Sequence, residues 1–367
     1  MAARTAKEVP SRSRIDRLRL SFSGLGAEAY LVAHLPNIRY LCGFTGSAGI
    51  LLVESSRSTL FTDSRYRFQA REEVRDSGVY VAKHGLIRAV WEALRRLRGR
   101  TCVAYAPDQV TVAQKSALES GAGNRVRWVD GDREIEKLRA VKDALELATM
   151  REAAVLISDV FRGVLRAIKP GIAELEVAAE IEYAMKQRGA TGPSFETIVA
   201  SGPRSAWAHA RPSSKLLRKN ELVVLDQGAI LRGYCSDMTR TVYLGRSPAK
   251  VRRLYEAVLE AQEAAKAAIR PGVTAGNVDA AARGVLRRRG LARYFTHSTG
   301  HGLGIEVHEM PRLGRGGETV LEQGMVVTVE PGVYVEGLGG IRIEDDVLVT
   351  AGNGVDLTNA PREFLEL

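Results

Sequence analysis

A six-residue segment, Ala167-Ile168-Lys169-Pro170-Gly171-Ile172, recurs 101 residues later as Ala268-Ile269-Arg270-Pro271-Gly272-Val273. Each copy ends one helical pattern at Pro-Gly and begins a second, which stops at Gly189 or Gly290. An apolar β-run follows in both copies, at residues 222–228 and 325–332. Two similar halves of this kind predict one α+β domain with pseudo-twofold duplication and a cleft in the crease between the halves.

The residues before the repeat have a different pattern. Between residues 15 and 136, helical patterns alternate with short β-rich runs that are bounded by turn signals, which is typical of an α/β domain. The runs are residues 29–32, 49–53, 58–61, 79–81 and 101–104. From Lys137 the chain becomes helix-rich and alternately charged. We therefore predict a flexible arm at 1–14, an α/β domain at 15–136 and the duplicated domain at 137–367.

The composition is that of a globular protein with a sizeable core. The chain has 367 residues, of which 45% are hydrophobic and 26% charged, which excludes disordered and small disulfide-stapled classes. No window approaches the roughly 18 unbroken apolar residues of a membrane span. The three cysteines, Cys42, Cys102 and Cys235, are odd in number and widely spaced, so neither a disulfide framework nor a CxxC metal site is expected. The basic N-terminal arm lacks the apolar segment of a secretory signal. We expect a cytoplasmic protein without a membrane partner.

The net charge of +10 raises the question of nucleic-acid binding. Basic runs at residues 95–100 and 287–289 are able to neutralise phosphates. Both runs also finish helical patterns next to Gly99 or Gly290, where cations complement the helix dipole. No helix-turn-helix, zinc-finger or RNP pattern accompanies them. We favour solvated helix ends and expect no nucleic-acid partner.

Acidic residues occupy equivalent places in the two halves. The repeat aligns Asp226 with Glu330, each at the end of an apolar strand. A second acid, Asp237 or Glu344, lies on the strand-like run that follows. Any one of them alone is typical of a helix cap or a surface salt bridge. Four acids that converge repel one another unless cations bind between them, so the symmetry favours a metal site.

A histidine completes the candidate ligand set. His301 lies in a glycine-rich segment, residues 296–309, that contains three of the six histidines. One imidazole with four carboxylates suits two divalent ions about 3.5–4 Å apart. Manganese or cobalt fits this oxygen-rich set best, and zinc is possible. The glycines of residues 300–304 lack the GxGxxG spacing, and His308-Glu309 is not followed by the second histidine of HExxH.

The order and setting of these residues resemble those of the pita-bread metallopeptidases, which include methionine aminopeptidase, aminopeptidase P and prolidase. The matching motifs are VLDQGA at 224–229, SDMTRT at 236–241, GHGLG at 300–304, VEPG at 329–332 and GIRIED at 340–345. Residues 34–41, 43–47 and 61–66 also resemble the N-terminal domain of prolidases, aminopeptidases P and creatinase. Methionine aminopeptidases generally lack that domain, and creatinase-like members have lost the ligands. The resemblance therefore implies the Xaa-Pro-cleaving branch.

The resemblance also implies a role for each ligand. Asp226 would chelate one ion, and His301 and Glu330 the other. Asp237 and Glu344 would bridge the two ions. Glu330 would in addition act as a catalytic residue that carries a proton to the leaving imino nitrogen.

Further residues match catalytic or substrate-binding positions of that family. His209 and His308 would polarise the scissile carbonyl and hold the tetrahedral intermediate, although the turns around His209 are also typical of a surface loop. Arg342 either orients a bridging carboxylate or meets the substrate. Arg312 or Arg315 is a candidate partner for a substrate carboxylate.

The resemblance implies that the partners are short proline-containing peptides and that the protein is a homodimer. The activity would be that of an Xaa-Pro dipeptidase or an Xaa-Pro aminopeptidase. Two alternatives stay open from the sequence. One is a metal-dependent hydrolase of a non-peptide small molecule, and the other is a peptide-binding relative without catalytic activity.

Overall fold

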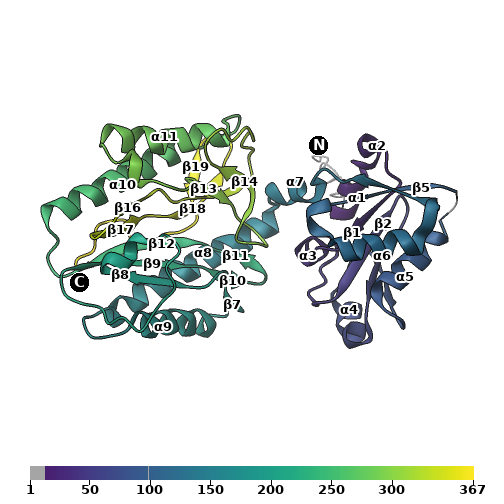
Figure 1. Ribbon diagram of the computed structural model, residues 1–367, viewed down its shortest axis with the longest axis horizontal. Helices are drawn as coiled ribbons and strands as arrows, with labels where there is room; N and C mark the ends of the chain where they lie inside the picture. The colour runs from purple at the N-terminus through teal and green to yellow at the C-terminus, as the bar shows by residue number, and fades with distance from the viewer. Residues whose placement is uncertain (1–12, 98) are drawn as a thin grey trace, which may run out of the picture. The chain divides into compact units, whose positions relative to one another are not determined.

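The computed structural model describes residues 13–97 and 99–367. The described chain forms two compact units that divide between Arg139 and Ala140 (Figure 1). The sequence boundary at 136/137 lies three residues earlier. Most of the arm predicted at 1–14 is outside the described residues, but Ser13 caps the first helix by accepting a hydrogen bond from Asp16 N.

The first unit is built on a six-stranded mixed sheet in the order β4-β3-β2-β1-β5-β6. The strands are β1 (Ala29–Val32), β2 (Gly49–Glu54), β3 (Ser58–Thr62), β4 (Gly78–Val81), β5 (Thr101–Tyr105) and β6 (Val126–Asp130). The helices are α1 (Arg14–Arg19), α2 (Phe22–Leu25), α3 (Leu35–Cys42), α4 (Arg67–Glu73), α5 (Leu86–Arg95), α6 (Val112–Ala122) and α7 (Glu134–Ala140). Apolar side chains of α5 and α6 pack on the sheet. All five predicted runs form strands, and β6 is an additional strand.

The first half of the second unit places two helices over one sheet. Helices α8 (Ala144–Val164) and α9 (Glu174–Gln187) contribute the apolar side chains that cover the strands. The sheet has the order β12-β9-β8 and contains β8 (Ile198–Ser201), β9 (Glu221–Gln227) and β12 (Met238–Leu244). A smaller sheet contains β7 (Gly192–Pro193), β10 (Ala229–Leu231) and β11 (Tyr234–Cys235).

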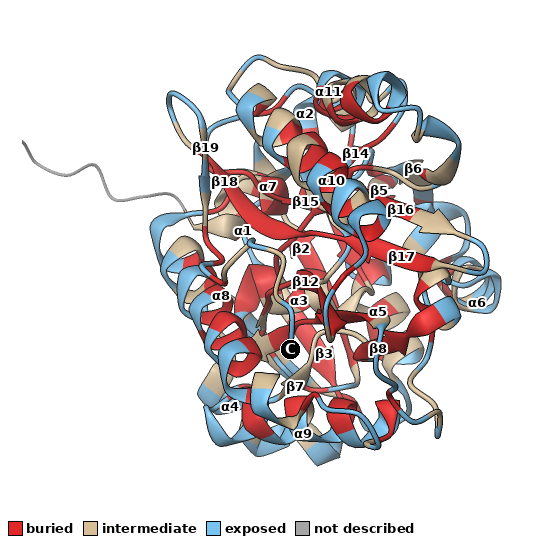
Figure 2. Cartoon of the chain, turned by 90° about the vertical axis from the view of Figure 1, so that its left-hand side faces the viewer, coloured by how far each residue is buried: buried red, intermediate tan, exposed pale blue. Residues whose placement is uncertain are grey.

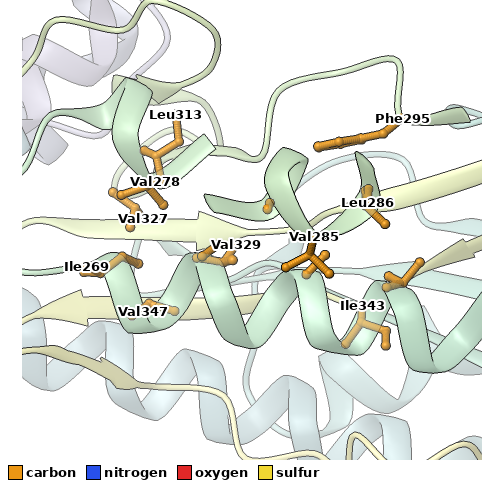
Figure 3. Packing of buried hydrophobic residues seen from close by; sticks show 14 of the residues in the cluster. Ile269, Val278, Val285, Leu286, Phe295, Leu313, Val327, Val329, Ile343 and Val347 are labelled. Carbon is orange, nitrogen blue, oxygen red and sulfur yellow. The ribbon is translucent and has the colours of Figure 1, made fainter. Parts of the chain in front are cut away.

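The second half repeats this plan with helices α10 (Ala249–Ala268) and α11 (Ala275–Arg288). Its sheet has the order β14-β13-β15-β18-β19. These strands are β13 (Gly300–Gly302), β14 (Glu309–Leu313), β15 (Val326–Val329), β18 (Asp345–Val349) and β19 (Gly354–Asp356). A hairpin of β16 (Gly332–Val335) and β17 (Gly339–Arg342) completes it. Val278 and Val285 of α11 lie in one apolar cluster with Val327, Val329 and Val347 of the sheet (Figure 3). The duplicated α+β fold is thus confirmed.

The two halves join where their central strands meet. Glu344 N donates to Thr239 O on β12 over 3.1 Å. The Thr241 hydroxyl donates to Arg342 O at 2.9 Å and accepts from Arg342 N at 3.1 Å. The strands that meet here are largely buried (Figure 2). The crease between the halves is therefore a rigid, desolvated place for charged side chains. None of the described helices is both long and apolar enough to cross a membrane.

Candidate metal centre

The acids reach the crease through the ends of paired strands. Asp226 is the penultimate residue of β9, and Glu330 directly follows β15. Asp237 and Glu344, predicted in strand-like runs, each lie instead in a two-residue break before β12 or β18. The physical reason is that their backbone N–H groups bond outside the ladder: Asp237 N donates to Asp346 Oδ2 at 3.1 Å, and Glu344 N donates across the halves.

Distances place His301 among three of these carboxylates. His301 Nε2 lies 3.7 Å from Asp237 Oδ2 and 3.6 Å from Glu330 Oε1. Asp237, His301 and Glu344 each offer one ligand atom, and these atoms all lie within 4.8 Å of one another. His301 Nδ1 is 3.0 Å from Gly302 O, which only accepts hydrogen bonds, so Nδ1 carries the proton. Nε2 therefore presents its lone pair to the carboxylates, as a metal ligand does.

Asp226 joins the same group through Arg342. Arg342 Nη2 donates to Asp226 Oδ2 at 2.5 Å, and Arg342 Nε donates to Thr239 Oγ1 at 2.9 Å. Thr239 Oγ1 in turn donates to Glu344 Oε2 at 2.6 Å. Arg342 thus contacts one of the four acids directly and a second through a threonine, which favours an orienting role.

The carboxylates of the group are unfavourable as anions unless positive charge is bound among them. Burial, with neighbouring carboxylates adding to it, raises the pKa of Asp237 and of Glu344 well above their ordinary values. Burial likewise raises the pKa of Glu330 to about 8. Burial lowers the pKa of His301 to about 4, so its ring is neutral. Among the described residues, Asp226 Oδ1 and Asp237 Oδ1 are buried without a hydrogen-bond partner. Acceptor atoms without donors fit divalent cations.

The two histidines expected at the reacting carbonyl lie at the edge of this group. The rings of His301 and His308 have centroids 4.4 Å apart. Burial and, secondarily, the charge of nearby His209 lower the pKa of His308. The neighbour of His209 is also anchored, because Ala208 O accepts from Arg342 Nη1 at 3.1 Å. His308 thus lies against the ring of His301, whereas His209 is exposed and lies near enough to His308 to affect its pKa.

Two residues that the sequence analysis did not assign extend the network. Tyr334 Oη accepts from Arg342 Nη1 at 2.8 Å and lies 2.9 Å from His297 Nε2. His297 Nδ1 is 2.7 Å from Ser298 O, so its Nε2 is the acceptor for the tyrosine hydroxyl. Burial lowers the pKa of His297 to about 4, which keeps the ring neutral. Tyr334 follows Glu330 by four residues, but only the β16–β17 register reveals its partner.

Replacing Tyr334 with phenylalanine is expected to lower kcat by roughly five- to tenfold, since Arg342 would lose one of its constraints. The buried His297 acceptor would be left unpaired, which costs about 1–3 kcal/mol of unfolding free energy. Steady-state kinetics and thermal unfolding measure both effects. Tyr294→Phe, which removes a hydroxyl bound only to Arg293 among the described contacts, is the matched control. Equal losses in both variants would contradict the role of Tyr334.

A cationic cavity of about 650 Å³ opens beside this network. Its lining includes His297 and four arginines, Arg283, Arg293, Arg312 and Arg315, and no acidic residue. Arg312 lies opposite His301 in the β13–β14 pair, so the two side chains share one face of the sheet.

Comparison with known proteins identifies the family. Residues 148–351 match the model of metallopeptidase family M24, and residues 14–141 match the creatinase/prolidase N-terminal domain. The chain belongs to metallopeptidase family M24. A member of this family is a hydrolase whose chemistry uses divalent metal ions, in agreement with the centre described above.

Relatives within the M24 family align over nearly the whole chain. An Xaa-Pro dipeptidase of Pyrococcus horikoshii is 36% identical over 92% of this chain and 94% of its own length. The structure of an Xaa-Pro dipeptidase from Bacillus anthracis superposes with a TM-score of 0.92 at 38% identity, covering 96% of this chain and 99% of that one. An X-Pro aminopeptidase structure from Thermotoga maritima gives 0.87 at 36% identity, covering 95% and 100%. Chain length and fold therefore agree with both enzyme types.

Proposed function

We propose that this M24 protein hydrolyses the peptide bond that precedes proline at the N-terminus of short peptides. The observation that carries the proposal is the convergence of His301 with three buried acids and the partly buried Glu330 on a duplicated scaffold. The ligand set is Asp226, Asp237, His301, Glu330 and Glu344. Relatives that align over nearly the whole of this chain are named for Xaa-Pro substrates, which supports this substrate class.

The residues divide the chemical work. Divalent ions held by such ligands supply Lewis-acid polarisation of a carbonyl and activation of water. His209 and His308, at the edge of the group, would hydrogen-bond the scissile carbonyl and hold the oxyanion that forms from it. Glu330 would accept a proton from the attacking water and return it to the proline nitrogen as the bond breaks. Arg342 would keep Asp226 and, through Thr239, Glu344 in place.

Cleavage itself is the first test. Protein loaded with Mn²⁺ is expected to hydrolyse Xaa-Pro dipeptides or Xaa-Pro-Yaa tripeptides, and to lose activity when a chelator removes the metal. Liquid chromatography of the products separates the two substrate types. A metal-loaded protein that cleaves neither type would leave the non-peptide hydrolase and the silent peptide binder as the surviving alternatives.

We also propose that the cationic cavity receives the C-terminal carboxylate of a dipeptide. Among the described residues, neither the Arg312 nor the Arg315 side chain has a hydrogen bond or ion pair, and both are exposed. Replacing Arg312 with alanine is expected to raise KM for an Xaa-Pro dipeptide roughly tenfold, because a charge-assisted Arg–carboxylate pair is lost. The KM for the amidated dipeptide should hardly change. Arg253→Ala, which removes an exposed arginine of α10 that does not line the cavity, is the matched control, and equal KM shifts for acid and amide would contradict the assignment.

The finer properties are likewise proposals. Manganese or cobalt suits the carboxylate-rich set, and zinc is the third choice. Three cysteines without a disulfide, of which Cys42 and Cys235 are buried, support a cytoplasmic location. A homodimer follows from the resemblance to the Xaa-Pro branch, and light scattering on the purified protein would measure it.

A further inference from the structure

Two buried carboxylates outside the proposed ligand set make the same type of hydrogen-bond cluster, one in each half of the second unit. Glu174 begins helix α9, and Asp279 lies in the second turn of α11. Their exposed fractions are 0% and 1%. Each carboxylate accepts from both the amide and the hydroxyl of at least one Ser or Thr, and also from the guanidinium of an arginine. Such burial of charge is costly unless the hydrogen bonding is complete, so the arrangement needs a reason.

The Glu174 cluster consists of Glu174, Ser201, Arg204 and Ser213. Glu174 Oε1 accepts from Ser201 N and Ser201 Oγ, both at 2.8 Å. Oε2 accepts from Ser213 N at 3.2 Å, Ser213 Oγ at 2.7 Å and Arg204 Nε at 3.1 Å. Ser201 and Ser213 flank the loop that contains His209. One carboxylate therefore closes the base of this loop.

Further bonds fix the rest of the His209 loop. Arg204 Nη2 donates to Arg211 O at 2.6 Å, which ties the cluster to the returning half of the loop. Ala208 O accepts from Arg342 Nη1 at 3.1 Å at the opposite end. His209 thus follows a residue held by the metal-centre network, in a loop whose base is held by Glu174.

The Asp279 cluster consists of Asp279, Arg283 and Thr299. Asp279 Oδ1 accepts from Thr299 N at 3.2 Å and from Thr299 Oγ1 at 2.8 Å, and Oδ2 accepts from Arg283 Nε at 2.7 Å. Thr299 precedes His301 by two residues. Thr299 O also accepts from Glu330 N at 2.7 Å. The cluster therefore holds the backbone beside two of the proposed metal ligands.

The two clusters do not occupy equivalent positions in the repeat. At the offset of 101 residues, Glu174 corresponds to Ala275, one helical turn before Asp279. The arginine comes from a short 3-10 helix, Gly202–Ala206, in the first half and from α11 itself in the second. The same chemistry thus arises at different positions, next to a different functional segment in each half.

We propose that Glu174 and Asp279 are positioning residues with separate tasks. Glu174 holds His209 toward the substrate carbonyl, and Asp279 holds His301 and Glu330 for the metal ions. The task of Glu174 rests on the proposed function, whereas that of Asp279 requires only metal binding.

Two isosteric variants separate these tasks. Glu174→Gln is expected to lower kcat roughly tenfold while the Mn²⁺ Kd, measured by calorimetry, changes less than about twofold. Asp279→Asn is expected to weaken Mn²⁺ binding by about 10- to 100-fold, with kcat recovering at saturating Mn²⁺. In a His209→Ala background, Glu174→Gln should have almost no further effect on kcat, because the two act as one unit. Glu146→Gln, which removes another buried first-turn carboxylate, is the matched control and should leave kcat and Kd unchanged.

The opposite pattern would overturn the proposal. Unchanged Mn²⁺ affinity in Asp279→Asn, or an undiminished effect of Glu174→Gln in the His209→Ala background, would mean that the clusters only stabilise the fold. Should the variants fail to fold, Ser201→Ala and Thr299→Val each remove one hydroxyl from a cluster. Ser201→Ala is then expected to lower kcat, and Thr299→Val to weaken Mn²⁺ binding. If the wild-type protein binds Mn²⁺ but cleaves no Xaa-Pro peptide, the proposed function fails separately. Amide hydrogen exchange then decides the Glu174 part, since residues 202–212 should exchange faster in Glu174→Gln and not in Asp279→Asn.

Discussion

Replacing Asp237 with alanine is expected to abolish hydrolysis and to lower the bound metal below two ions per chain. Asp237 Oδ2 lies 3.7 Å from His301 Nε2, and its other oxygen is buried without a partner, so this side chain is at the centre of the ligand set. The Lewis-acid contribution of metal ions is worth several kcal/mol, which corresponds to a loss of about a thousandfold or more in kcat. Peptide hydrolysis assays and elemental analysis measure the two effects.

The stability of the metal-free protein distinguishes a ligand from a merely structural acid. Burial and the carboxylates of Glu344 and Asp226 raise the pKa of Asp237, so its charge is unfavourable without a cation. Asp237→Asn should therefore leave the melting temperature of the metal-free protein unchanged or raise it, while Mn²⁺ should stabilise the variant much less than the wild type. Glu256→Ala, which removes an exposed acid from α10, is the control for both measurements. Full activity with two ions bound in Asp237→Ala would refute the assignment.

The sequence predicted the ligand set because duplication makes it visible. The two copies place Asp226 and Glu330 at matching strand ends, and the second acid of each half follows at a similar distance. The order and spacing of these acids along the chain can be read directly from the sequence. The placement of Asp237 and Glu344 in breaks before strands was not predicted, because their N–H groups bond to residues more than a hundred positions away.

The supporting residues were hidden for the same reason. Tyr334 meets Arg342 only through the register of the β16–β17 hairpin, and His297 approaches from another segment. In the sequence, Glu174 and Asp279 look like the exposed acids that are common near helix starts. Only their burial in the structure shows that they bind segments distant in the chain. Strand β6 carries Arg127 between apolar residues, so a half-buried edge strand gave a weak pattern.

Replacing Arg240 with methionine is expected to cause the largest loss of stability. All five N–H groups of its buried guanidinium are used. Nε donates to Pro361 O at 2.8 Å; Nη1 donates to Thr239 O at 2.9 Å and Glu344 O at 2.6 Å; Nη2 donates to Asp345 Oδ1 at 2.8 Å and Ala360 O at 2.9 Å. Removing one partner of a buried ion pair costs about 3–5 kcal/mol. For a domain of this size that corresponds to a fall of roughly 6–20 °C in melting temperature. Calorimetry resolves the transition of the second unit.

The environment of Asp345, the carboxylate partner of Arg240, determines how much stability the loss of Arg240 costs. Burial alone would raise the pKa of Asp345, but Arg240, Arg362 and Lys266 outweigh it, and the pKa is lowered. Gln262 Nε2 at 2.5 Å and the Thr358 hydroxyl at 2.7 Å also bind this carboxylate. Arg362 and Lys266 stay beside this carboxylate, so removing Arg240 would leave its charge only partly compensated and would also leave four backbone oxygens without this donor. Asp345→Asn in the Arg240→Met background should recover part of the lost stability, whereas two independent losses would simply add.

Metal binding tests whether Arg240 also joins the two halves at the metal centre, because Arg240 binds backbone oxygens on both sides of the crease. Thr239 and Glu344, the two residues whose carbonyl oxygens it binds, are also joined through their side chains at 2.6 Å. Loss of Arg240 should therefore loosen Glu344 as a ligand and weaken Mn²⁺ binding about tenfold, in addition to lowering stability. Arg362→Ala, which removes a half-buried partner of the same carboxylate, should lower stability less and leave Mn²⁺ affinity unchanged. An Arg240→Met variant with wild-type melting temperature and metal affinity would show that the two halves are joined by other contacts.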